Sequence, residues 1–181
     1  MNVTETKLKG CFIIEPKVFY DDRGYFYESF NKANFEEILG HKINFVQDNQ
    51  SFSSKGVIRG LHYQKGDHAQ AKLVSVNSGM VLDVAVDLRE GSLTYGKYVS
   101  AILSAENKKQ MFIPRGFAHG FVVLSESAEF FYKCDNFYNK ASEAGIIYND
   151  SSLNIDWKLP TDQLVISEKD KELPLFKDAE L

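Results

Sequence analysis

A β-type alternation dominates the middle of the chain. The run MVLDVAVDL at 80–88 puts two leucines and two valines on one side of an extended strand, and Asp83, an alanine and Asp87 on the other. Five more short apolar runs lie around it, at 73–76, 97–103, 111–114, 121–124 and 129–134. Many short strands separated by Gly, Asn and Asp predict a mainly β chain, either an antiparallel sandwich or a small barrel.

Two short helices are expected at the periphery of this β structure. Asn31 is suited to an N-cap, Phe35, Ile38 and Leu39 form an apolar stripe, and Gly40 stands where a C-cap belongs. A second helical piece begins at Ser167, with acidic residues in its first turn, and Pro174 discourages its continuation.

The charge balance narrows the possible partners. The 181 residues carry a formal net charge of −4 and contain no Lys/Arg run, which argues against nucleic acid or an anionic membrane as a partner. No apolar run approaches a membrane span, and the N-terminus has no apolar signal segment. Cys11 and Cys134 fit no CxxC spacing. We expect one cytoplasmic domain over residues 1–181, with both thiols reduced.

Two histidine-bearing stretches, GLHYQ at 60–64 and PRGFAHGF at 114–121, raise the question of a metal. The second has the P-x-G-x-x-H spacing of the second motif of cupin barrels, in which a turn projects the histidine, here His119, into the barrel mouth. A stable divalent site needs three or four converging ligands. Only His62 and His119 are well placed, because His68 lies too far along the chain, so we predict no bound metal.

The order of motifs resembles the dTDP-4-dehydrorhamnose 3,5-epimerase family. The matching stretches include EPKVFYDDRGYFYESF, FVQDNQSFSSKGVIRGLHYQ, AQAKLVSV, GMVLDVAVDLREGSLTYGK, LSAEN, IPRGFAHGFVVLSE, EFFYKCDNFYNKASEAGI, IDW and ISEKD, which together run from residue 15 to residue 170. The resemblance implies a cupin jelly-roll barrel, also called a double-stranded β-helix, with a few short peripheral helices. It also implies a homodimer, in which the N-terminal segment of about residues 1–50 contributes to the interface and covers exposed strand edges.

The implied reaction explains the residue types. The hydrogens at C3 and C5 of a nucleotide-linked 4-keto sugar flank the carbonyl, so inversion needs a base, an acid on the opposite face and a stabilised enolate oxygen. No redox cofactor is required. By resemblance, His62 is the base and Asp170 fixes its tautomer, Tyr132 is the acid, and Lys72 lies near the enolate oxygen. Ordinary structural roles compete: Tyr132 shares a strand face with Phe130, and Asp170 lies in a charged stretch.

The remaining matched positions are expected to bind the substrate. Arg59 would hold the diphosphate through bidentate contacts. A regular strand puts Arg59 and His62 on opposite faces, so we expect a bulge at Gly60. The full set of expected binding residues is Arg23, Phe26, Glu28, Gln47, Asn49, Ser51, Ser53, Arg59, His119, Tyr138 and Glu143.

The chain also departs from the usual family pattern. Tyr20 stands where a small residue is common, no proline follows Ser92, and Arg115 replaces a frequent glutamate. These differences leave the nucleotide and the sugar open. The alternatives are an epimerase for a GDP-linked 4-keto heptose in capsule or lipopolysaccharide synthesis, a C3-only or C5-only epimerase, a cofactor-free 3,4-ketoisomerase, and a sugar-binding cupin without turnover.

Overall fold

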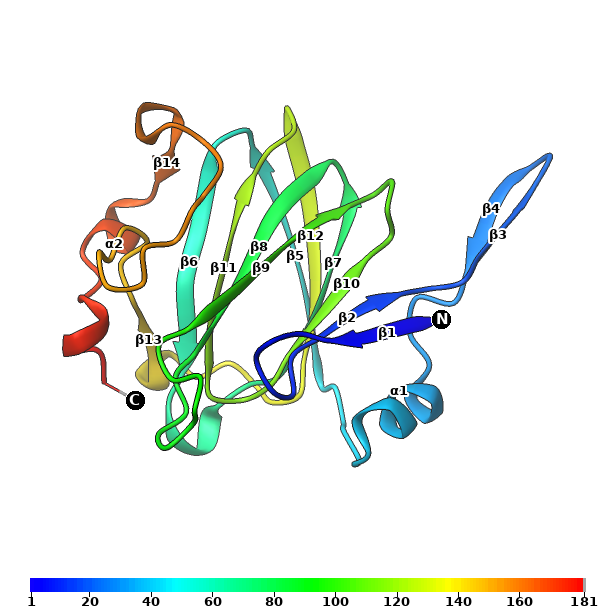
Figure 1. Ribbon diagram of the computed structural model, residues 1–181. Coiled ribbons are helices and arrows are strands. Elements are labelled where there is room, and N and C mark those ends of the chain that lie inside the picture. Colours follow the sequence, from blue (N-terminus) through cyan, green and yellow to red (C-terminus); the bar gives the residue numbers. More distant parts are fainter. Residues whose placement is uncertain (181) are drawn as a thin grey trace.

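Two antiparallel sheets that face each other form the body of the protein (Figure 1), in a computed structural model that describes residues 1–180. The first sheet has the order β1 (Asn2–Glu5), β2 (Phe12–Glu15), β10 (Gln110–Ile113), β7 (Lys72–Ser78), β12 (Ser127–Cys134) and β5 (Gln47–Ser54). The second has the order β13 (Glu143–Gly145), β6 (Val57–Gln64), β11 (Phe117–Val123), β8 (Met80–Asp87) and β9 (Tyr98–Ser104), with β14 (Val165–Ile166) parallel to β6. All six apolar runs identified in the sequence fall on β7 to β12, so the predicted mainly β jelly roll is confirmed.

The interior of the barrel is built from side chains of both sheets. Val74, Met111 and Phe130 of the first sheet pack with Ala85 and Phe121 of the second in one buried cluster. Phe121 and Phe130 stack with ring centroids 4.1 Å apart, which joins the two sheets directly.

Strand β8 is buried on both faces. Asp83 and Ala85 point into the barrel, whereas Leu82 and Val84 belong to a second cluster with Trp157 of the C-terminal segment. The more apolar face of the alternating run therefore lies outside the barrel, where the C-terminal segment covers it.

Both expected helices form with the expected caps. In α1 (Lys32–Leu39) the Asn31 side chain accepts hydrogen bonds from two backbone N–H groups, and Gly40 ends the helix with φ 70°. Phe35 is buried against the outer side of the first sheet. In α2 (Glu168–Lys171) the Ser167 hydroxyl accepts from the N–H of Asp170. Short 3₁₀ turns occupy Gly66–His68, Lys140–Ser142, Thr161–Gln163 and Phe176–Asp178.

A two-stranded arm extends away from the barrel (Figure 1). It consists of β3 (Val18–Asp21) and β4 (Gly24–Tyr27), which among the described residues pair only with each other. Its aromatic side chains are largely exposed, Phe26 to 70% and Tyr20 to 72%. Within residues 1–180, neither helix has the length and apolarity needed to cross a membrane.

Candidate active site

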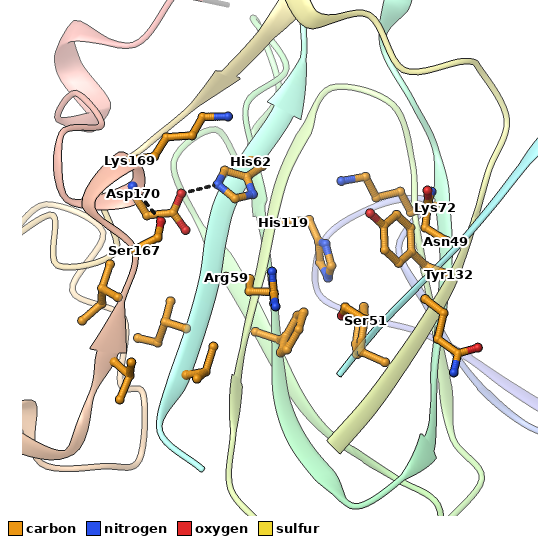
Figure 2. A pocket seen from close by; sticks show the side chains of 17 residues that line it. Asn49, Ser51, Arg59, His62, Lys72, His119, Tyr132, Ser167, Lys169 and Asp170 are labelled. Atoms are coloured by element: carbon orange, nitrogen blue, oxygen red, sulfur yellow. Dashed lines mark hydrogen bonds and ion pairs between the residues drawn. The ribbon is translucent and has the colours of Figure 1, made fainter. Parts of the chain in front are cut away.

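A cavity of about 610 Å³ opens between the two sheets and the C-terminal segment. Eight of the residues singled out in the sequence line it: Asn49, Ser51, Arg59, His62, Lys72, His119, Tyr132 and Asp170. Figure 2 shows their side chains gathered from strands of both sheets and from α2. The fold thus brings together residues that are up to 121 positions apart in the sequence, from Asn49 to Asp170.

An imidazole–carboxylate pair forms one wall of the cavity. His62 Nε2 lies 2.8 Å from Asp170 Oδ1, and the other carboxylate oxygen accepts a hydrogen bond of 3.3 Å from the N–H of Gly60. Burial alone would raise the pKa of Asp170, but hydrogen bonds from His62, Gly60 and Ser167 outweigh it and hold the pKa below its usual value. An ionised carboxylate only accepts hydrogen bonds, so Nε2 of His62 carries the proton and Nδ1 is the free ring nitrogen.

Gly60 lets Arg59 and His62 reach the same cavity. Its φ is 128°, the Gly60–Leu61 peptide bond is cis, and the β6–β11 register shifts between His119 and Phe121. A Cβ on Gly60 would lie 2.6 Å from the Cα of Gly120, so only glycine fits here. The expected bulge is therefore confirmed at the expected residue.

Tyr132 and Lys72 occupy the opposite sheet from His62. Figure 2 shows both side chains reaching into the cavity from the side that faces the histidine. The Lys72 ammonium lies 5.8 Å from the centre of the Tyr132 ring. Burial raises the pKa of the Tyr132 hydroxyl, which therefore carries its proton at neutral pH, and burial lowers the pKa of Lys72.

His119 pairs with an acid that the sequence analysis did not select. Its Nε2 lies 2.9 Å from Asp83 Oδ2 and 3.1 Å from Oδ1, and both residues are buried. Burial lowers the pKa of His119 and raises that of Asp83, since it disfavours the charged form of each group. An aspartate inside an otherwise apolar strand run was the signal that could have identified it.

Further polar residues expected to bind the substrate form two hydrogen-bonded groups. Arg59 Nε donates to Ser53 Oγ at 3.0 Å, which places Ser53 behind the arginine, outside the cavity lining. Gln47 Nε2 donates to Asn49 Oδ1 at 3.1 Å, and Gln47 Oε1 accepts from the N–H of Tyr138. Asn49 faces the cavity, whereas Gln47 supports it from outside the lining.

A further chain of contacts joins the predicted residues Tyr138 and Glu143 to the cavity. The Tyr138 hydroxyl donates to Glu143 at 2.9 Å, and Glu143 forms an ion pair of 2.7 Å with Lys169. Lys169 lines the cavity next to Asp170 but was not among the residues predicted from the sequence. Its position in the charged stretch SEKDKE gave no means of telling it from a surface lysine.

Three expected binding residues lie away from this cavity. Arg23, Phe26 and Glu28 belong to the β3–β4 arm or its base, where Arg23 pairs with Asp21 and Glu28 accepts from Asn31. The described structure brings none of the three to the cavity of its own chain.

Metal ligands do not converge within residues 1–180: no group of three or more His, Cys, Asp and Glu side chains is arranged to hold an ion. His68 instead contacts Asn139 outside the cavity. The absence of a bound metal stays a prediction.

A family model, a protein relative and a solved structure that resemble this chain carry the same family description. A family model described as dTDP-4-dehydrorhamnose 3,5-epimerase matches residues 5–178. A protein of that name from Escherichia coli K12 is 55% identical over 173 residues, 96% of this chain and 93% of the relative. The crystal structure of a dTDP-4-dehydrorhamnose 3,5-epimerase from Elizabethkingia anophelis NUHP1 superposes with a TM-score of 0.95 at 63% identity, over 98% of this chain and 97% of that one.

A related crystal structure contains a sugar nucleotide. It is a dTDP-6-deoxy-D-glucose-3,5-epimerase from Legionella pneumophila Philadelphia 1 in complex with dTDP-4-keto-L-rhamnose. It is 52% identical, with a TM-score of 0.94 over 98% of this chain and 93% of that one.

Proposed function

The chain belongs to the dTDP-4-dehydrorhamnose 3,5-epimerase family, and we propose that it inverts C3 and C5 of a dTDP-linked 4-keto-6-deoxyhexose. The substrate is dTDP-4-dehydro-6-deoxyglucose and the product is dTDP-4-dehydro-L-rhamnose, a step of dTDP-rhamnose synthesis. One observation carries this proposal: a carboxylate-bound histidine and a protonated tyrosine face one cavity from opposite sheets.

His62 is the base. With Nε2–H held by Asp170, Nδ1 is free to remove the proton from C3 or C5, and the imidazolium that results is stabilised by the carboxylate. The electron pair of the broken C–H bond moves into the carbonyl group and leaves an enolate oxygen at C4. The Lys72 ammonium is placed to stabilise this charge, an interaction that is typically worth about 3–4 kcal/mol of barrier.

Tyr132 completes the inversion. Because it extends from the sheet opposite His62, its phenol can return a proton to the face of the sugar that the base does not touch. Proton transfer by such a group contributes roughly 10²–10⁴-fold to the rate. No electron is gained or lost overall, so the reaction needs no redox cofactor.

The rest of the substrate extends from this centre toward the mouth of the cavity. Arg59 binds the diphosphate, Ser51 and His119 contact the hexose or the nearby phosphate, and Asn49 contacts the base or ribose. Ser53 and Gln47 hold Arg59 and Asn49 in place. Tyr138 stacks on the thymine, and Glu143 contacts the base or ribose.

The arm completes the site in a homodimer. Arg23, Phe26 and Glu28 lie off the cavity of their own chain, and the arm extends free of the barrel, which supports a position beside the partner's cavity. Strand β5 ends the first sheet, and its outer edge pairs with no strand of residues 1–180, so a partner segment can cover it. We place the enzyme in the cytoplasm, since Cys11 and Cys134 are both buried free thiols.

Hydrogen exchange in deuterated water tests the function. The protein is incubated with dTDP-4-dehydro-6-deoxyglucose, and NMR follows the signals at C3 and C5. We expect deuterium at both carbons, and none at either carbon with His62→Ala. Exchange at one carbon alone would identify a single-centre epimerase. No exchange, or faster exchange with a GDP-linked 4-keto sugar, would overturn the proposed substrate.

A further inference from the structure

A second, larger cavity of about 780 Å³ lies between α1 and the first sheet. Its apolar floor comes from the sheet residues Phe12 and Phe112, from Leu39 at the end of α1 and from Ile43 in the segment that follows the helix. None of its lining residues lines the catalytic cavity. Cavities of 300–1,000 Å³ with an apolar lining and a few convergent polar groups are typical of small-molecule sites.

The polar part of this lining is mainly basic. Lys9, Lys42, Arg89 and Arg115 come from four separate segments of the chain. The two acidic groups are already engaged: Glu5 accepts from the N–H of Gly10, and Asp135 accepts from Arg115 and Ala71. Within residues 1–180, the ammonium groups of Lys9 and Lys42 form no ion pair or hydrogen bond.

The two arginines present further donors to the same space. Arg89 uses Nε and Nη2 to bind Asp87, and Arg115 uses the same two nitrogens to bind the carboxylate and carbonyl of Asp135. Each guanidinium is thereby fixed in orientation, and its Nη1 makes no hydrogen bond to any described residue. A fixed guanidinium with free N–H groups recognises carboxylate and phosphate oxygens.

We propose that this cavity is a second ligand site, which binds a small organic anion with a carboxylate or phosphate group on a flat apolar body. The apolar body packs on Phe12 and Leu39, and the anionic group faces Lys9, Lys42 and the two arginines. The inference does not depend on the epimerase activity.

The site is connected to the catalytic cavity through the backbone. Asp135 Oδ1 accepts a 2.6 Å hydrogen bond from the N–H of Ala71, the residue directly before Lys72. The N–H of Asp135 in turn donates to the carbonyl of Ala71 at 3.1 Å. An anion bound to Arg115 is therefore linked to the start of β7, which carries Lys72, through two hydrogen bonds: Arg115 to Asp135, and Asp135 to Ala71.

Phenyl phosphate is a suitable probe for this site. The ¹⁵N-labelled protein is titrated with it, with and without dTDP at a concentration that fills the catalytic cavity. We expect saturable shifts of the Gly10 and Ala71 amides that are the same in both series. Tighter binding of phenyl phosphate than of inorganic phosphate is expected from the apolar floor. No saturable shift, a response abolished by dTDP, or equal binding of the two phosphates would overturn the proposal.

A charge-matched pair of variants tests the residues. Lys9→Gln with Lys42→Gln should raise the dissociation constant for phenyl phosphate about tenfold, the usual effect of losing two exposed ion pairs. Lys55→Gln with Lys97→Gln removes the same charge from exposed positions outside both cavities and should leave the constant unchanged. If both double variants bind phenyl phosphate equally weakly, only the net charge of the protein matters, and the proposed binding site is refuted.

Discussion

Asp170→Asn should disable the base while keeping the shape of the site. The Asp170 side chain is nearly inaccessible, 4% exposed for the residue, and its two oxygens accept from His62 Nε2 and from the N–H of Gly60. An asparagine can satisfy the Gly60 N–H only with its oxygen, so its NH₂ group must turn toward His62. Nε2 then has to accept, the proton moves to Nδ1, and the nitrogen that faces the substrate no longer has a lone pair.

The magnitude follows from the bonds involved. Losing one charge-assisted hydrogen bond costs about 1.5–3 kcal/mol, which corresponds to about 10–150-fold in rate. The change of tautomer lowers the rate further. To react, His62 must carry its proton on Nε2, and the NH₂ group of the asparagine that faces Nε2 then has no acceptor. We therefore expect kcat for epimerisation to fall at least 100-fold, with KM changed much less because both Asp170 oxygens are engaged by His62 and by the N–H of Gly60.

Deuterium exchange measured at C3 and C5 separately is the assay. Both rates should fall together, because one base serves both carbons. Ser167→Ala is the control: it removes the hydroxyl that caps α2 but leaves the carboxylate, so its effect should be much smaller. The thermal unfolding transition shows whether the Asp170→Asn variant is folded. If the folded variant keeps its exchange rates within twofold of the wild type, Asp170 does not orient the base.

Three other changes test separate parts of the structure. Tyr132→Phe should retain solvent exchange at both carbons but lower the rate of inversion about 100-fold, as measured by NMR of the product. Lys72→Met should leave the protein folded but lower kcat about 10²–10³-fold, and steady-state kinetics would measure this loss. Burial alone would raise the pKa of Asp87, but hydrogen bonds from Arg89, Thr94 and Ser92 outweigh it and hold the pKa well below its usual value. Its stabilising effect is therefore present above about pH 4 and lost as the pH falls further, so the difference in unfolding free energy between wild type and Asp87→Asn should shrink in acid.

The local elements could be predicted from local sequence. The caps of α1 at Asn31 and Gly40 are set by side-chain acceptors and by left-handed backbone, both visible in a few neighbouring residues. The bulge at Gly60 followed from strand geometry, because two residues three positions apart had to reach one ligand.

The assembly of the site could not be derived from periodicity. His62 and Asp170 stand 108 positions apart in the sequence, no pattern between them joins the two, and only the family resemblance suggested the pair. In β8 the alternation separated Asp83 from the leucines correctly, but it did not reveal which side faces the barrel interior. That choice depends on the C-terminal segment, which covers the leucine face and leaves Asp83 inside beside His119.

The two-sheet architecture divides the chemistry in a way that suits an inversion. Lys72 pairs with Cys134 in the β7–β12 register, so Lys72 and Tyr132 are diagonal neighbours on the inner face of one sheet. The residues proposed to stabilise the enolate and to return the proton are therefore held in fixed relation by the backbone hydrogen bonds between β7 and β12. His62, the proposed base, belongs to the other sheet, and Asp170 of α2 holds its ring through a 2.8 Å contact. A change in the C-terminal segment should consequently alter proton removal while leaving the acid and the ammonium in register, whereas a change in β7 or β12 should disturb both of these groups together.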